Sequence, residues 1–172
     1  IGSGAIGLCT LDVAKRNGAE VLIADIVPEK LEIAEKMGAD KTVLVNGENL
    51  QDTIDKFTNK EGMPVIVDTV CSISSFEDSI QMASPAGRIV VIGLVDTPSK
   101  IAQADITKKE LTIVGSRLNC NKFKETIDAF EKGELSPELL RTHSFHFTEI
   151  KDALELIRSE PEKVIKMGLR FD

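Results

Sequence analysis

The first seven residues, Ile-Gly-Ser-Gly-Ala-Ile-Gly, restrict the possible folds more than any other part of the sequence. Gly2, Gly4 and Gly7 form a G-x-G-x-x-G pattern that runs directly into an amphipathic stretch at residues 8–16. The next apolar run ends in Asp25, 18 residues after Gly7. An acid about 20 residues beyond such a loop is typical of dinucleotide binding. A glycine pattern alone is a weak signal, but the loop, the helix and the acid together predict a dinucleotide-binding fold.

After this loop, short apolar runs rich in β-branched residues alternate with amphipathic stretches. The alternation is typical of βαβ units, in which helices cover both faces of a largely parallel sheet. The expected fold class is therefore α/β with a doubly wound parallel sheet, the Rossmann fold. The expected strands are residues 21–24, 42–45, 65–67, 88–92 and 111–114, and the expected helices are residues 8–16, 28–37, 50–57 and 72–82.

The sequence after Gly115 differs in character. We expect helices at 123–132 and 149–158, and strands at 144–147 and 164–171. The last strand alternates apolar and polar residues, which indicates either one solvated face or a different sheet. At the other end, only Ile1 stands where a central strand should precede the glycine loop. We therefore interpret the sequence as a fragment, or as one whose N-terminus is missing.

Composition excludes several classes of partner. The 172 residues include 21 Lys and Arg against 28 Asp and Glu, a formal net charge of −7, which disfavours nucleic acid and anionic membranes. No apolar run approaches the ~20 residues that span a bilayer, and no signal peptide is recognisable. The three cysteines are widely spaced and odd in number, which favours free thiols in a reducing cytoplasm.

The glycine loop and Asp25 predict a specific cofactor. Gly2 allows a tight turn, Gly4 lets a pyrophosphate approach the backbone, and Gly7 lets helix and strand pack closely. The phosphates would face the unpaired N–H groups at the positive end of the helix. Asp25 would accept hydrogen bonds from both adenosine ribose hydroxyls and repel a 2′-phosphate, so the sequence predicts NAD rather than NADP. Lys30 would reach the ribose or a phosphate, or is an ordinary lysine of the helix surface.

With these residues in place, the chain resembles the zinc-type medium-chain dehydrogenase/reductase family of the alcohol dehydrogenase superfamily. The polyol, sugar-acid and threonine dehydrogenase branch is the most similar, and Gly115-Ser-Arg-Leu-Asn resembles a bacterial subgroup of sugar-acid or starvation-sensing type. The likeness runs along the whole chain, and its order is more specific than any single motif. It rests on residues 2–8, 14–15, 17–19, 36–40, 67–70, 86–93 and 111–117.

The resemblance implies a domain division and further cofactor contacts. Residues 1–141 would form the NAD-binding Rossmann domain, and residues 142–172 would return to a catalytic domain whose N-terminal part is absent. The implied contacts are Ala5 and Ile6 at the pyrophosphate, Asp25 and Lys30 at the adenosine ribose, Val70 near the adenine or its ribose, Ile92, Gly93 and Leu94 on the nicotinamide side, and Ser116 and Arg117 over the nicotinamide. Arg117 follows a predicted strand, where doubly wound sheets bind ligands, although an ordinary surface salt bridge explains it equally well.

The implied activity is hydride transfer from a secondary alcohol, polyol or sugar acid to NAD, with catalytic zinc supplied by the missing domain. No zinc ligand is assigned within this chain. His143 and His146 lie three residues apart on an expected strand and would point to opposite faces. The spacing of Cys9, Cys71 and Cys120 does not match a four-cysteine structural zinc loop. The fragment alone is expected to be inactive.

Three other interpretations remain open. A zinc-free quinone reductase of the same family is the nearest alternative, although such enzymes commonly prefer NADPH. A non-catalytic nucleotide-binding module is the second alternative. A methyltransferase that uses S-adenosylmethionine is the third, but these usually lack a glycine at the position of Gly7. As for assembly, the resemblance implies a homodimer or tetramer formed through the edge strand Leu111–Val114.

Overall fold

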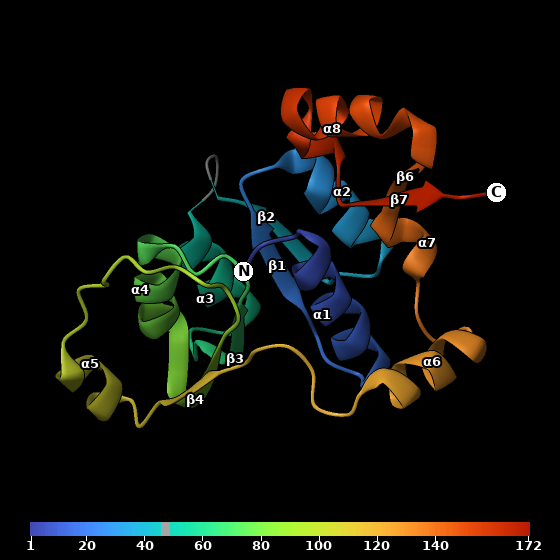
Figure 1. The fold of residues 1–172 in the computed structure, drawn as a ribbon. Coiled ribbons are helices and arrows are strands. Elements are labelled where there is room, and N and C mark those ends of the chain that lie inside the picture. Colours follow the sequence, from blue (N-terminus) through green and yellow to red (C-terminus); the bar gives the residue numbers. More distant parts are fainter. Residues whose placement is uncertain (46–48) are drawn as a thin grey trace. The chain divides into compact units, whose positions relative to one another are not determined.

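The computed structural model describes residues 1–45 and 49–172 (Figure 1). These residues form two compact units. The first unit contains Ile1–Gly2 and Val43–Cys120, and the second contains Ser3–Thr42 and Asn121–Asp172. The peptide bond between Gly2 and Ser3 thus joins the two units within the glycine loop. The predicted boundary between residues 141 and 142 stays a prediction.

A parallel three-stranded sheet forms the centre of the first unit. Its strands, in the order β3 (Met63–Asp68), β4 (Ala83–Val91) and β5 (Thr112–Gly115), place Asp68 beside Val91 and Val91 beside Gly115. Ile1 adds one paired residue on β3, since its amino group donates to the carbonyl of Val67 at 2.6 Å and its carbonyl accepts from the N–H of Thr69 at 3.1 Å. All three strands therefore end at the same edge.

Three helices accompany this sheet: α3 (Leu50–Phe57), α4 (Ile73–Met82) and α5 (Gln103–Lys108). Asn49 and Ser72 begin the first two, because each side chain accepts a hydrogen bond from a backbone N–H three residues later. Apolar side chains of α3, α4 and the strands form the core, in which Ile54, Ile80 and Ile89 are almost inaccessible to solvent.

The second unit begins with the glycine-loop helix. Its elements are α1 (Ala5–Arg16), β1 (Leu22–Asp25), α2 (Pro28–Lys36) and the start of β2 (Lys41–Leu44), which forms a two-stranded sheet with β1. Gly7, Leu8 and Leu11 are the buried residues of α1. Pro28 suits the first turn of α2, and Gly38 follows that helix at φ +88°, a conformation that favours glycine.

The C-terminal part of the second unit contains α6 (Phe123–Glu131), α7 (Pro137–Leu140), β6 (Arg141–His146), α8 (Ile150–Ser159) and β7 (Lys166–Arg170). Single 3₁₀ turns at Phe147–Glu149 and Pro161–Lys163 flank α8. Strands β6 and β7 pair in parallel and form their own sheet, separate from the other two (Figure 1). Of the two alternatives expected for the last strand, one solvated face or a different sheet, the structure shows a different sheet.

Most expected elements are present, with differences at particular ends. Helix α1 begins at Ala5 rather than at residue 8, because Gly4 takes the extended N-cap conformation and the next residues are helical. Strand β4 begins at Ala83 rather than at Arg88, with an irregular register between Met63 and Val65 on its partner strand. Two short helices, α5 and α7, were not predicted. Within the described ranges, no helix has the length and apolarity that crossing a membrane requires.

Candidate functional site

Gly2 lies where the chain turns close to the end of β3. Its φ is +90°, a conformation that side-chain-bearing residues rarely adopt. A Cβ at this position would lie 2.6 Å from Oγ1 of Thr69 and 2.8 Å from Cγ2 of Val70, so the turn has no room for a side chain. The Thr69 hydroxyl also donates to the carbonyl of Ile1 at 2.8 Å. The sequence at this position must therefore be glycine for both conformational and steric reasons.

Gly4 is the N-cap of α1, and its surroundings differ from those of Gly2. No side chain caps the helix, its first turn contains no acidic residue, and a Cβ on Gly4 would meet no atom within 4 Å. The N–H groups of the first turn, at Ala5, Ile6 and Gly7, are thus at the positive end of a twelve-residue helix. Backbone donors and open space beside Gly4 are what a phosphate group requires.

Asp25 ends β1, and its carboxylate binds the glycine loop. Oδ2 accepts a hydrogen bond from the backbone N–H of Ser3 at 2.6 Å, and Oδ1 accepts one from the N–H of Val27 at 2.9 Å. A carboxylate has about four acceptor positions, so about two remain for further donors. Lys30 lies in the first turn of α2, five residues beyond Asp25, and is half-buried.

In the first unit, Asp68 forms hydrogen bonds with two of the predicted cofactor residues. The carboxylate Oδ1 of Asp68 accepts from the N–H of Val70 at 3.0 Å, and its carbonyl accepts from the N–H of Ile92 at 3.0 Å. Gly93 follows, and Leu94 is 75% exposed. These residues all follow the ends of β3 and β4. Asp68 is fully buried and belongs to no site predicted from the sequence.

Ser116 and Arg117 follow the end of β5 directly, and both side chains are exposed. The N–H of Ser116 donates to the carbonyl of Val91 at 2.9 Å, which continues the β4–β5 pairing by one residue. The two residues are thus at the same edge of the sheet as the residues after β3 and β4. In parallel α/β sheets this edge, at the carboxyl ends of the strands, is where ligands bind.

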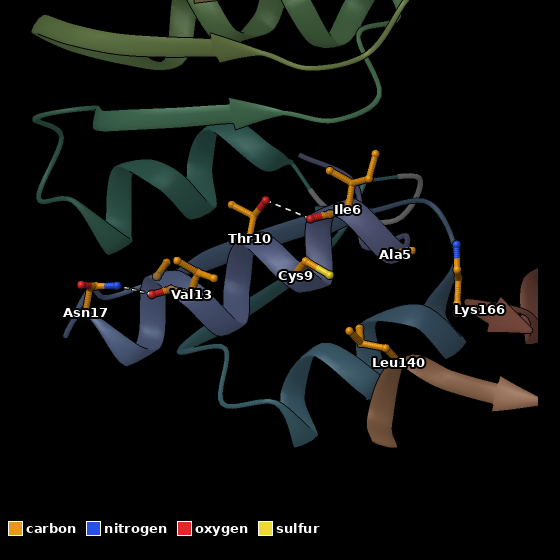
Figure 2. Close-up of a pocket in the computed structure, with 9 residues that line it drawn as sticks. Ala5, Ile6, Cys9, Thr10, Val13, Asn17, Leu140 and Lys166 are labelled. Atoms are coloured by element: carbon orange, nitrogen blue, oxygen red, sulfur yellow. Dashed lines mark hydrogen bonds between the residues drawn. The ribbon is translucent and has the colours of Figure 1, made fainter. Parts of the chain in front are cut away.

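A pocket of about 720 Å³ lies beside α1 in the second unit, and Figure 2 shows its lining residues. Most of the lining is apolar and comes from α1, including Ala5, Ile6 and Val13. Lys166 of β7 also lines the pocket and brings a positive charge to it. Lys166 was not predicted, because it lies at the other end of the chain and belongs to no recognised motif.

Cys9 belongs to the same pocket. Burial raises the pKa of its thiol and the Asp12 carboxylate raises it further, while Lys166 opposes both effects. The thiol is therefore protonated at neutral pH. In the described part of the chain, no three His, Cys, Asp or Glu side chains gather as a metal site requires. His143 and His146 both lie in β6, so the alternation of a strand separates them.

Residues 5–132 match the zinc-binding dehydrogenase family. The starvation-sensing protein RspB of Escherichia coli K12 is 38% identical over 174 residues, which cover 99% of this chain and 50% of that protein. The L-threonine 3-dehydrogenase of Rhizobium johnstonii is 32% identical over 162 residues, covering 92% of this chain and 46% of that enzyme. The chain thus spans about half the length of these curated relatives.

Solved structures agree with the family match. The RspB alcohol dehydrogenase of E. coli CFT073, crystallised with NADH, superposes with a TM-score of 0.87 at 37% sequence identity. The superposition covers 96% of this chain and 49% of that one. The predicted α/β Rossmann-type fold, with helices on parallel strands, is confirmed by this likeness.

Proposed function

The chain belongs to the zinc-binding dehydrogenase family, and on that premise we propose that it is the NAD-binding part of an oxidoreductase. Its parent protein would transfer a hydride from a secondary alcohol, polyol or sugar acid to C4 of the NAD nicotinamide. The relatives named as dehydrogenases and the NADH-bound structure support the general class. The choice of NAD rather than NADP rests on this chain's own residues.

The observation that carries the proposal is the position of Asp25. Its carboxylate is at the end of β1 and is hydrogen-bonded to the N–H of Ser3, within the glycine loop itself. An adenosine ribose beside this carboxylate would find acceptors for its two hydroxyls. A 2′-phosphate at the same place would put two negative charges together and is disfavoured. The residues present therefore fit NAD.

The phosphates are proposed to bind at Gly2, Gly4, Ala5, Ile6 and Gly7, where the first-turn N–H groups of α1 are open. Lys30 would assist at the ribose, and Lys166 would add a positive charge near the first turn of α1. Val70, Ile92, Gly93, Leu94, Ser116 and Arg117 keep the roles that the family resemblance implies. Each of these residues would bind or orient the cofactor, and none of them would transfer a proton or a hydride.

The zinc implied by the family name would take its ligands from outside this chain, since the described side chains form no suitable cluster. We assign no step of the reaction to it. The proposed substrate is a small alcohol, polyol or sugar acid, and the proposed location is the cytoplasm.

Strand β5 is the last strand of the β3–β4–β5 sheet, and we propose that its free edge pairs with a second copy in a homodimer or tetramer.

Calorimetric titration of the protein with NADH and with NADPH, in separate experiments, tests the cofactor assignment. We expect NADH to bind at least about tenfold more tightly than NADPH, a difference of about 1.4 kcal/mol. Equal affinities, or tighter binding of NADPH, would refute the assignment of Asp25. Absence of binding by a protein whose circular dichroism shows a folded α/β domain would refute the function itself.

A further inference from the structure

The thiol of Cys71 forms hydrogen bonds with both the turn after β3 and the turn after β4. The Cys71 Sγ–H donates to the carbonyl of Asp68 at 3.1 Å, and the backbone N–H of Gly93 donates to the same sulfur at 3.1 Å. The thiol is thus donor to one turn and acceptor from the next. The two turns are also in close contact, because a Cβ on Gly93 would lie 2.7 Å from Cβ of Cys71.

The carboxylate of Asp68 shapes the first of these turns. Oδ1 accepts from the N–H groups of Val70 at 3.0 Å and Cys71 at 2.8 Å, and Oδ2 accepts from the Ser75 hydroxyl at 2.9 Å. Asp68 is completely buried, so these hydrogen bonds replace its contacts with water. The turn between Asp68 and Cys71 is therefore held by two backbone donors, and the Ser75 hydroxyl of α4 fixes the same carboxylate from the other side.

Cys71 occupies a backbone conformation that normally favours glycine. Its φ is +52°, and its side chain is buried. Burial raises the pKa of the thiol and the nearby Asp68 carboxylate adds to this, although the N–H groups of Gly93 and Ile92 oppose it. The sulfur therefore keeps its proton at neutral pH, as its bond to the Asp68 carbonyl requires. A strained backbone at a residue with this bonding pattern suggests that the thiol itself is needed.

We propose that Cys71 is a positioning residue for the nicotinamide half of the cofactor, because its thiol connects the Asp68 turn to the backbone of Gly93. This inference rests on the proposed function, in which Val70 lies on the adenosine side and Ile92–Leu94 lie on the nicotinamide side. Loss of the thiol would leave the N–H of Gly93 without its partner in the turn after β4, while Asp68 still holds the turn after β3. The nicotinamide side would then loosen and the adenosine side would not.

The test compares Cys71→Ser, Cys71→Ala and Cys71→Gly in the full-length protein that carries this chain, with Cys120→Gly as the matched control. Ser keeps a donor and an acceptor, Ala removes both, and Gly removes both while suiting the positive φ. Dissociation constants are measured for NADH and for ADP-ribose, which lacks the nicotinamide. Thermal unfolding is recorded for each variant, so that binding is compared only among folded proteins.

Cys71→Ala and Cys71→Gly are expected to bind NADH about fivefold more weakly and ADP-ribose within about twofold of the wild type. Cys71→Ser and Cys120→Gly are expected to match the wild type with both ligands. Unchanged NADH binding in the Ala and Gly variants overturns the inference, as does an equal loss for NADH and ADP-ribose. If the wild type itself binds neither ligand, the proposed NAD function fails, and the role of Cys71 fails with it.

Discussion

The backbone N–H of Ser3 donates a 2.6 Å hydrogen bond to Oδ2 of Asp25. The residue that is expected to select NAD therefore also holds the loop that is expected to bind its phosphates. Selection of the ribose and shaping of the glycine loop depend on the same carboxylate. A change at Asp25 should consequently affect both properties, and the two effects can be separated by comparing variants of different size.

Asp25→Ala is expected to weaken NADH binding by at least about tenfold, because the variant loses the ribose acceptors and the partner of Ser3. Asp25→Asn keeps a carbonyl oxygen but removes the charge, so it should lose less NADH affinity. The ratio of NADPH to NADH affinity should rise in both variants, since the repulsion of a 2′-phosphate is gone. Calorimetric titration measures each value. A folded Asp25→Ala protein with unchanged NADH affinity would contradict this prediction.

Lys109 is expected to stabilise the first unit at the end of α4. Its Nζ donates to the carbonyl oxygens of Ile80 at 2.9 Å, Gln81 at 2.5 Å and Ala83 at 3.0 Å. The last turn of α4 contains no basic residue of its own. Lys109→Met leaves these carbonyls without that donor and should lower the free energy of unfolding by about 2 kcal/mol.

Urea denaturation of Lys109→Met and of the neighbouring Lys108→Met tests this role. Lys108 is exposed, so its substitution should change the free energy of unfolding by less than about 0.5 kcal/mol. Equal losses in the two variants would mean that the removal of a positive charge, rather than of the three hydrogen bonds, lowers the free energy of unfolding.

The spacing of apolar residues was sufficient to predict the helices and strands that are long enough for this spacing to repeat. Helix α3 has the predicted bounds, residues 50–57, because an N-cap asparagine and a regular apolar period mark both ends. Helices α5 and α7 have six and four residues, too few for a 3.6-residue period to be recognised. The first part of β4 contains Ser84 and Pro85, which normally indicate a turn, so a strand there was not expected.

The candidate site was predictable only where a motif exists. The glycine loop and Asp25 form a local spacing pattern, and they were recognised from it. The Cys71–Gly93 bond depends on the parallel register that sets Asp68 beside Val91, and residue spacing contains no information about that register. Lys166 similarly approaches α1 through the pairing of β6 with β7. Such contacts follow from tertiary structure rather than from any periodic signal.

Ala86→Gly is expected to stabilise the protein. Ala86 has φ +58° and an exposed side chain, so glycine removes a steric conflict without removing core packing. The relief of about 1–2 kcal/mol exceeds the added chain entropy of glycine, which leaves a gain of about 0.5–1 kcal/mol. Ala83→Gly is the opposite control, because Ala83 is buried at φ −66°. Chemical denaturation should show a gain for the first variant and a loss for the second.

Asp40 is expected to make stability depend on pH in the acid range. Hydrogen bonds from the Lys15 ammonium at 2.6 Å and the Val21 N–H at 2.7 Å lower the pKa of its carboxyl, while desolvation opposes them. A lowered folded-state pKa means that the unfolded chain binds the proton more readily. The stabilisation is therefore complete above the ordinary carboxyl pKa of 3.8 and is lost as the pH falls through the lower folded-state value.

Thermal unfolding of the wild type and of Asp40→Asn between pH 7 and pH 2.5 measures this contribution. Asparagine keeps the shape and one acceptor oxygen but cannot be ionised, so the variant should unfold at a lower temperature at pH 7. The difference between the two proteins should shrink steadily below pH 4, because the protonated wild-type carboxyl then resembles the amide. Lys15→Met should reduce the same pH dependence from the other side of the ion pair. A difference in Tm that stays constant over the whole pH range would show that Asp40 acts through its shape and not through its charge.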